Sequence, residues 1–591
     1  MRRHRRLSLS RRLLLLSLLL PGLARAGVQL VVDGVDDRLK AAVTSGLELS
    51  QYAARDVSDA QIRRLYARAP DQAKAALEPY GYYDATVESD LQQVGRDWRV
   101  TLHVKPGEPV RITSVDVRLD ADALALPAVR RAERAIERLK GQPLDHGAYE
   151  AARDGLARQL TANGFLDARL VTRRVEVNRG NRSAEVRLAW QAGRRFRFGR
   201  VHFEGSQFRP GFLDRYVPFK RGDYFLQDDL LQLQQALTGA DYFAVVNVLP
   251  EVDEARDGVV DVKVELAPAR RSIYTGGPFI GTDTGFGVRG GLERRWVNDR
   301  GHKWKNEIVL AQRLKMVSSL YSIPMPGDDQ RSFNFGANYR AANTDTSDSH
   351  TLELVANETR LWHGWTRTLG LHALSGTFTV GKKGGEPDNT LGIEHGRSTL
   401  LYAEASLARK QADNPSFVRK GWSINVTARS TAGTLLSDAR FSQLLADAKW
   451  IHALGRRDRL ILRGSAGMTW TSDFGALPPQ LRFFAGGDRS VRGYSYQSIG
   501  PRNSYDRVVG GRNLLVGSSE VEHYFTRNWG MAAFVDAGNA FDGTDYRPKI
   551  GAGLGVRWLS PVGMIRVDLG TPVHSKDEHG IQLHIVIGPD L

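Results

Sequence analysis

The most informative part of this 591-residue chain is one glycine-rich run, Phe484-Ala485-Gly486-Gly487-Asp488-Arg489-Ser490-Val491-Arg492-Gly493-Tyr494. Glycines on both sides of Arg492 let a loop turn sharply and enter a confined space. A buried arginine needs carboxylate partners, because an unpaired buried charge is costly and a bidentate pair is strong. Candidate partners follow downstream: Glu520 and Glu522, two apart and therefore on one face of a strand, and Asp536.

The residues around this run have the pattern of a membrane β-barrel. From Arg270 onward, alternating segments of about ten residues are separated by Gly, Asp, Asn and Pro, and nine of the eleven tryptophans lie here, mostly near expected strand ends. This pattern is typical of outer-membrane barrels, with a soluble β-sandwich as the alternative. Some 320 residues at about 20 per strand and turn predict about 16 antiparallel strands. We expect strands at 459–469, 531–537, 550–558, 564–569 and 581–587.

The N-terminal part is expected to hold three small α+β modules. Gly81-Tyr82-Tyr83-Asp84-Ala85 and Gly164-Phe165-Leu166-Asp167-Ala168 each precede a strand pair, and a third copy starts at Asp241-Tyr242-Phe243. Self-similarity at a fixed spacing indicates an array of modules. Each module has a β-α-α-β-β pattern, with expected boundaries at 27–105, 106–191 and 192–267 and the barrel at 268–591. Exposed edge strands in such modules can pair with an extended polypeptide.

Composition narrows the function classes. The chain has no cysteine, which excludes disulfides and thiol chemistry, and its net charge is +16. A basic start, the apolar run 13–20 and Ala24-Arg25-Ala26 predict a signal peptide over 1–26, whose removal takes seven of those charges. The remaining surplus lies in 269–591, where it suits a polar lumen and anionic lipopolysaccharide. We therefore expect no nucleic-acid partner.

Four segments carry a resemblance to a known family. They are the Val491-Arg492-Gly493-Tyr494 loop, the strand with Glu520, Asp536-Ala537-Gly538, and Gly551-Ala552-Gly553-Leu554-Gly555-Val556-Arg557-Trp558-Leu559-Ser560-Pro561. Together they resemble the outer-membrane assembly-factor superfamily that contains BamA, TamA and two-partner secretion transporters, and the modules resemble its periplasmic POTRA domains. The resemblance implies that Arg492 is a lumen-inserted arginine with Asp536 and Glu520 as wall partners. Glu522 is an equally reachable alternative.

The resemblance is strongest to the TamA branch, through the three modules, the mature length and the ending Ile587-Gly588-Pro589-Asp590-Leu591. It implies an outer-membrane location with periplasmic N-terminal domains. It also implies unfolded outer-membrane clients such as autotransporters, and an inner-membrane-anchored partner of the TamB type.

The first and last strands of the expected barrel should pair weakly. The first contains Gly276, Gly277 and Pro278, and proline lacks a donor for the ladder. The last, Gly580-Ile581-Gln582-Leu583-His584-Ile585, resembles a β-signal, although the chain ends in Leu591 where that pattern has an aromatic residue. Our hypothesis is a lateral gate at this seam, lined by Gly276, Gly277, Gly580, Leu583 and Ile585.

Catalytic and metal signals are weak. Gly285-Phe286-Gly287-Val288-Arg289-Gly290 fits a dinucleotide pattern but leads into a strand, without the helix such a site needs. His574, His579 and His584 are best interpreted as lumen or rim residues, so we expect no enzyme, cofactor or metal. Two rival functions remain. A two-partner transporter exporting one dedicated exoprotein predicts two modules and a plug helix, and a passive porin needs no modules.

Overall fold

The computed structural model describes residues 27–587 apart from 54, 56, 96, 326–329, 385–388, 416, 434–435, 562 and 574–579. The expected signal peptide and the last residues of the chain, 588–591, lie outside the described residues. No helix in this described part combines the length and the apolar composition that crossing a membrane would need.

The first two modules each form a three-stranded sheet with helices, as expected. The first contains β1 (Val28–Asp33), α1 (Asp37–Gly46), η1 (Glu48–Tyr52), α2 (Asp59–Leu77), η2 (Glu78–Tyr80), β2 (Thr86–Val94) and β3 (Asp97–Lys105). The second contains β4 (Arg111–Arg118), α3 (Ala121–Leu124), α4 (Pro127–Glu137), α5 (His146–Ala162), β5 (Arg169–Asn178) and β6 (Ser183–Gln191). Their strand orders, β1-β3-β2 and β4-β6-β5, leave β2 and β5 as sheet edges.

The repeated glycine of these modules has a conformational role. Gly81 and Gly164 have φ angles of +85° and +95°, in the left-handed region that glycine adopts without steric cost. A Cβ on Gly164 would lie 2.8 Å from the carbonyl oxygen of Phe225. The backbone at Phe225, in the third module, therefore packs directly against this turn. Phe165, the aromatic residue after it, is buried in the module core. In these two modules the glycine therefore follows the helical segment, and the aromatic residue after it packs against the module core.

The third module departs from the β-α-α-β-β expectation. It contains β7 (Arg197–Glu204), η3 (Leu213–Tyr216), α6 (Gln227–Gly239), β8 (Phe243–Pro250), η4 (Val252–Glu254) and β9 (Val259–Pro268), in the sheet order β7-β9-β8. The first helix was wrongly predicted, because a short 3₁₀ turn stands in its place. Pro210, Gly211 and Pro218 surround this turn, and proline and glycine both disfavour a continuous helix.

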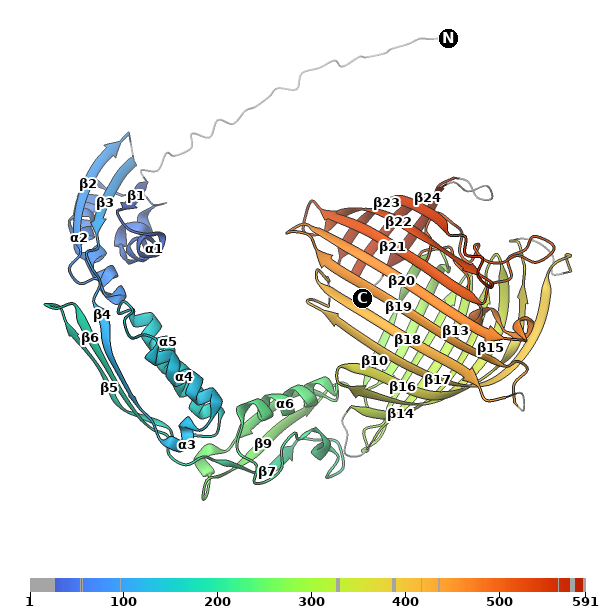
Figure 1. The fold of residues 1–591 in the computed structure, drawn as a ribbon, viewed down its shortest axis with the longest axis horizontal. Helices are drawn as coiled ribbons and strands as arrows, with labels where there is room; N and C mark the ends of the chain where they lie inside the picture. The colour runs from blue at the N-terminus through green and yellow to red at the C-terminus, as the bar shows by residue number, and fades with distance from the viewer. Residues whose placement is uncertain are drawn as a thin grey trace, which may run out of the picture. The chain divides into compact units, whose positions relative to one another are not determined.

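The described residues form 16 barrel strands joined in sequence order, which confirms the prediction. They are β10 (Ser272–Gly281), β11 (Gly285–Arg294), β12 (Lys303–Ala311), β13 (Leu314–Pro324), β14 (Arg331–Asn343), β15 (Ser347–Trp362), β16 (Trp365–Val380), β17 (Glu394–Ala412), β18 (Gly421–Thr431), β19 (Phe441–Ala453), β20 (Asp458–Thr471), β21 (Asn513–Tyr524), β22 (Trp529–Phe541), β23 (Lys549–Ser560), β24 (Gly563–Val573) and β25 (Gln582–Ile587). Figure 1 shows them surrounding a lumen. Within the loop between β20 and β21 lie η5 (Phe474–Ala476) and η6 (Pro479–Leu481).

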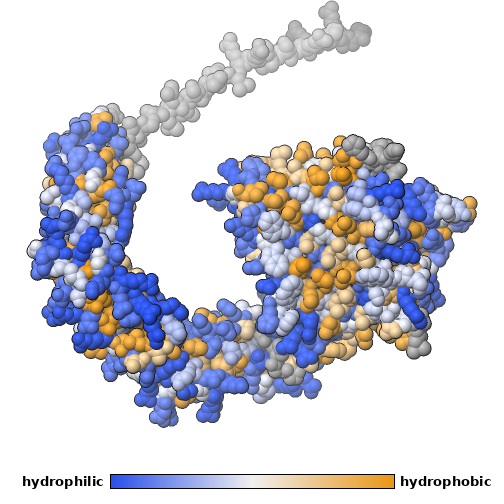
Figure 2. Space-filling view, viewed as in Figure 1, coloured by the Kyte–Doolittle hydropathy of each residue, from blue (hydrophilic) through white to orange (hydrophobic). Residues whose placement is uncertain are grey.

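Side chains alternate across the barrel wall. On β22, Met531 and Val535 are exposed, whereas Phe534 and Asp536 are buried on the opposite face. Figure 2 shows hydrophobic side chains gathered on the outer surface of the barrel. An apolar exterior and a polar interior are what a lipid-embedded barrel requires.

Candidate functional site

Arg492 joins the long loop between β20 and β21, residues 472–512, to the inner face of the barrel wall. We call this segment the lumen loop. The guanidinium of Arg492 donates to both carboxylate oxygens of Asp536 on β22, with Nε to Oδ2 at 2.7 Å and Nη2 to Oδ1 at 2.9 Å. Its backbone N–H also donates to Asp536, at 3.0 Å. Arg492 is 3% exposed and Asp536 is fully buried, so this bidentate pair is shielded from water.

Two further carboxylates complete the surroundings of Arg492. Its Nη1 donates to Glu520 on β21 at 2.7 Å and to Asp568 on β24 at 3.0 Å. The guanidinium also lies 3.5 Å from the centre of the Phe534 ring, which adds a cation–π contact. One loop arginine therefore ties three neighbouring parts of the wall together.

Glu522 contacts other arginines. It accepts from Arg459 on β20 at 2.5 Å and from Arg557 on β23 at 2.8 Å. Arg557 also reaches Glu520 at 2.6 Å and Asp568 at 2.5 Å. Of the two glutamates that the sequence leaves open, the structure places Glu520 against Arg492.

Among the described residues, these ion pairs join four arginines to four carboxylates in one network. Its members are Arg459, Arg463, Arg492 and Arg557 with Glu520, Glu522, Asp536 and Asp568. Arg463 is its loosest member, at 3.7 Å from Asp536. The network can be buried because each charge has an oppositely charged partner. Removing one member would leave an uncompensated buried charge.

Glycines in the wall make room for the loop backbone. A Cβ on Gly551 of β23 would lie 1.8 Å from the carbonyl oxygen of Arg492, and one on Gly570 of β24 would lie 2.7 Å from the amide nitrogen of Gly493. Gly493 itself has a φ of +93°. The loop backbone therefore contacts the wall backbone directly, which only glycine permits.

The other residues of the Val-Arg-Gly-Tyr run anchor the loop through apolar packing. Val491 and Tyr494 are buried in a cluster that also contains Ala485, Ile499 and Val516. The Tyr494 hydroxyl lies 3.5 Å from the carbonyl oxygen of Ile550. Polar and apolar contacts thus hold the same short segment.

The first and last strands of the barrel form its seam. In the sheet, β10 pairs with β11 and β25 pairs with β24, but no ladder between β10 and β25 is formed by the described residues. Ile585 N–H donates to the hydroxyl of Thr282, just beyond β10, at 3.0 Å. Gly276 and Gly277 lie in the exposed middle of β10, Gly580 precedes β25, and Leu583 is exposed on β25.

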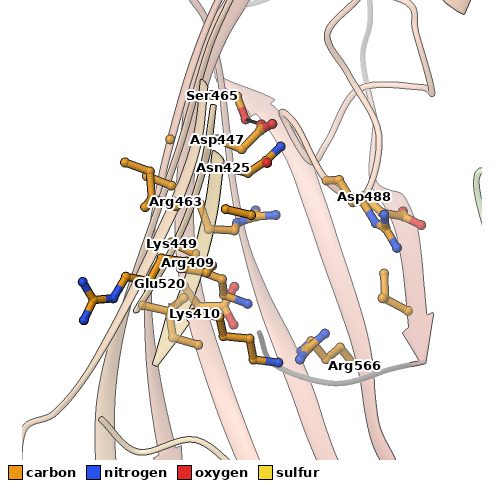
Figure 3. A pocket seen from close by; sticks show the side chains of 18 of the residues that line it. Arg409, Lys410, Asn425, Asp447, Lys449, Arg463, Ser465, Asp488, Glu520 and Arg566 are labelled. Atoms are coloured by element: carbon orange, nitrogen blue, oxygen red, sulfur yellow. Dashed lines mark hydrogen bonds between the residues drawn. The ribbon is translucent and has the colours of Figure 1, made fainter. Parts of the chain in front are cut away.

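A cavity of about 930 Å³ lies between the lumen loop and the wall. Its lining contains eight basic and four acidic side chains, so part of the positive surplus of the barrel faces the lumen. In Figure 3, Lys410 projects from the wall into the cavity and Asp488 lies across from it. Such a lining attracts anions and raises their local concentration.

The histidines near the C-terminus form no metal group that the structure describes. Among the described residues, no set of three or more His, Asp or Glu side chains is arranged to hold a metal ion. His574 and His579 lie outside the described residues. His584 is buried, with Nδ1 2.7 Å from Asp488.

Comparison with known proteins identifies the parts of the chain. Residues 298–589 match the Omp85 superfamily domain, residues 29–106 match the first POTRA domain of TamA, and residues 196–268 match a POTRA family described as a surface antigen variable number repeat. The outer membrane protein assembly factor BamA of Nitratidesulfovibrio vulgaris is 24% identical over 386 residues, covering 63% of this chain and 48% of BamA. This chain thus spans about half the length of that relative.

A more distant relative and a solved structure agree with these matches. The sorting and assembly machinery component 50 homolog A of Xenopus laevis is 22% identical over 345 residues, covering 53% of this chain and 68% of that protein. The crystal structure of Haemophilus ducreyi BamA lacking POTRA domains 1-3 superposes with a TM-score of 0.67 at 17% identity, covering 80% of this chain and 99% of that one. That superposition shows a shared fold.

These matches also give the location of the chain. An Omp85 barrel behind POTRA domains lies in the outer membrane, with the N-terminal domains in the periplasm. The chain combines an Omp85 superfamily domain with POTRA domains, the first of which is of the TamA type.

Proposed function

We propose that this protein is an outer-membrane assembly factor that inserts or translocates β-rich client proteins through a lateral gate between β10 and β25. The observation that carries the proposal is the unpaired seam, because β10 and β25 end the 16-stranded sheet on either side of it and form no ladder among the described residues. An edge strand presents unpaired N–H and C=O groups that can template another strand. A client strand would add to this edge and move laterally into the membrane.

The sequence of β10 supports opening at this place. Gly276, Gly277 and Pro278 follow one another in the middle of the strand, and all three are exposed. Glycine loses much conformational freedom when a strand forms, and proline donates no hydrogen bond to a neighbour. Both effects lower the free energy that closure would gain at the seam.

The ion network holds the lumen loop and one side of the seam in place. The lumen loop is bound to β21, β22 and β24 through Arg492. These strands lie on the C-terminal side of the seam. The network therefore keeps this part of the wall and the lumen loop together as one block. The end of β10 can separate from this block, because the described residues form no backbone ladder between β10 and β25.

A third feature supports capture of clients in the periplasm. The edge strand β2 carries Glu88 and Asp90, and β5 carries several arginines and a glutamate, whereas β8, one of the two edge strands of the third module, has no charged residue. Charged side chains protect sheet edges from pairing. Val245 and Leu249 on β8 are exposed, so this edge suits an extended apolar client segment.

No nucleotide is required in this mechanism. Client folding and burial of apolar surface in the membrane supply the free energy, and the protein lowers the barrier by offering a template. The clients are autotransporters and similar barrels, and a TamB-type inner-membrane-anchored protein is the partner. The match of residues 29–106 to the TamA-type POTRA domain supports both assignments.

A disulfide across the seam tests the gate. The chain has no cysteine, so Gly281→Cys with Ile585→Cys introduces a single pair. A Cβ on Gly281 would lie 3.8 Å from the carbonyl oxygen of Ile585. We expect the oxidised protein to stop assembling clients and the reduced protein to recover. The control pair is Val535→Cys with Ala552→Cys, on strands that are already paired. Normal assembly by the oxidised seam variant would overturn the proposal.

A co-purification experiment tests the partner. Detergent extracts of cells should yield the TamB-type protein together with the full chain. Photo-crosslinkers placed on the first module, at Asp90, and on the seam, at Tyr274, then show where it binds. Recovery of the full chain without that protein at either position would refute the partner assignment.

A further inference from the structure

Three segments that are far apart in the sequence meet at the end of the seam beside the β10–β11 turn. Asp488 of the lumen loop accepts a hydrogen bond from the Thr282 hydroxyl at 2.8 Å. The same carboxylate oxygen lies 2.7 Å from Nδ1 of His584 on β25. Asp488 thus contacts both sides of the seam, and it is 8% exposed.

The hydrogen bonds around His584 define the roles of its two ring nitrogens. The backbone N–H of Gly493 donates to Nε2 of His584 at 3.0 Å, so Nε2 carries a lone pair. The proton of the neutral ring is therefore on Nδ1, which donates it to Asp488. His584 is consequently bound to the lumen loop at two points.

Thr282 uses both of its hydrogen-bonding functions at the seam. Its hydroxyl donates to Asp488, and it accepts from the Ile585 N–H at 3.0 Å. This side chain therefore takes the place of the backbone ladder that β10 and β25 do not form among the described residues.

The position of Asp488 in the chain links the seam to the ion network. It precedes Arg492 by four residues, and Arg492 is fixed to β21, β22 and β24. The carboxylate is thereby held at the seam by the block that contains the lumen loop. The turn after β10 is the separable element, since it meets this block through Thr282 and Asp283.

We propose that Asp488 is a positioning residue of the gate, which clasps the end of β10 to β25 through Thr282 and His584. This inference rests on the proposed lateral gate and names the contact that must break for it to open. Opening releases Thr282 from Asp488, while Arg492 and the lumen loop remain in place on the wall.

A second carboxylate makes this contact reversible. Asp283 accepts from the backbone N–H of Asp488 at 3.5 Å, and burial and the Asp488 charge raise the pKa of Asp283 to about 7. The other ionisable groups near Asp283 are Arg489, His584 and Tyr496. When Asp283 and Asp488 are both charged, their repulsion opposes closure of the seam. The contact between Thr282 and Asp488 can therefore break and form again.

The test measures the seam distance in purified protein embedded in lipid, without a client. Spin labels at Ile280→Cys and Leu583→Cys, both exposed positions next to the seam, report that distance by pulsed electron paramagnetic resonance. We expect Asp488→Ala to raise the ratio of wide to narrow separations by about tenfold or more, the effect of losing a hydrogen bond to a charged group. Thr282→Val, which keeps the shape of the side chain, should act in the same direction.

The control is Asp506→Asn, in the same loop but in a largely exposed ion pair with Arg502, and it should leave the distances unchanged. Unchanged distances in both Asp488→Ala and Thr282→Val would overturn the clasp. Client assembly by the disulfide-locked protein separates the two hypotheses. If the seam widens in the variants but the locked protein assembles clients normally, the clasp stands and the gate is wrong.

Discussion

Replacement of Arg492 by alanine is the sharpest test of how the lumen loop is held. Glu520 and Asp568 keep Arg557 as a partner at 2.6 and 2.5 Å. Asp536 is fully buried, and among the described residues the cation left beside it is Arg463, at 3.7 Å, together with the backbone N–H of residue 492. Breaking a buried ion pair by removing one partner costs about 3–5 kcal/mol. We expect this cost to appear in the equilibrium between docked and released loop.

Thiol labelling measures that equilibrium. Ala485→Cys introduces the only cysteine at a fully buried position of the loop, so a water-soluble reagent reacts only when the loop is released. At ~1.4 kcal/mol per factor of ten, Arg492→Ala should accelerate labelling by about 100-fold or more. Arg492→Lys should fall between, because one ammonium cannot bind Asp536 in the bidentate geometry.

Two further variants isolate the cause. Adding Asp536→Asn to Arg492→Ala removes the uncompensated carboxylate charge. This second change should restore part of the free energy of loop docking, which a double-mutant cycle measures. Arg502→Ala breaks an exposed pair in the same loop and should change labelling only slightly. Labelling of Arg492→Ala within about threefold of the parent would refute the reasoning.

Three other perturbations follow from the structure. Gly551→Ala should release the loop as Arg492→Ala does, since its Cβ would lie 1.8 Å from a loop carbonyl, whereas Gly517→Ala, with nothing within 4 Å, should not; labelling of the same buried cysteine compares them. Val245→Lys should abolish binding of an extended client peptide to the β8 edge in a fluorescence anisotropy titration, whereas Val171→Lys on the charged strand β5 should leave it unchanged. The raised pKa of Asp283, about 7, means that its protonated form favours the closed seam, so wide separations should increase as pH rises from about 4 to 7 and then level off. Asp283→Asn should remove this dependence, and a parent protein with pH-independent distances would contradict it.

Much of the fold follows from local patterns in the sequence. Strict alternation, as on β22, predicts strands with one lipid face and one lumen face, and glycines around Arg492 predict a loop that enters a confined space. The first helix of the third module could not be predicted from the repeat. There, Pro210, Gly211 and Pro218 outweigh the pattern set by the first two modules.

The ion network could be predicted only in part. Arg557 and Asp568 were missed because they meet through strand register, in which Asp568 stands opposite Gly555. A Cβ on Gly555 would lie 1.8 Å from the Asp568 carboxylate, so this glycine makes room for the pair. In the sequence, the histidines nearest to His584 are His574 and His579, and neither indicates its partner. Its partner, Asp488, is 96 residues away in the sequence. The docked lumen loop brings the two side chains together.

In the proposed mechanism clients pass through the seam, and site-specific photo-crosslinking detects this passage at the strands where it occurs. Crosslinkers at Tyr274 on β10 and at Leu583 on β25 are compared with one at Met531, which is exposed on β22, all during assembly of a stalled client barrel. The account predicts that client strands are trapped at Tyr274 and Leu583 and not at Met531. Trapping at Lys410, which lines the lumen cavity, with none at the seam, would contradict it and would indicate export through the pore.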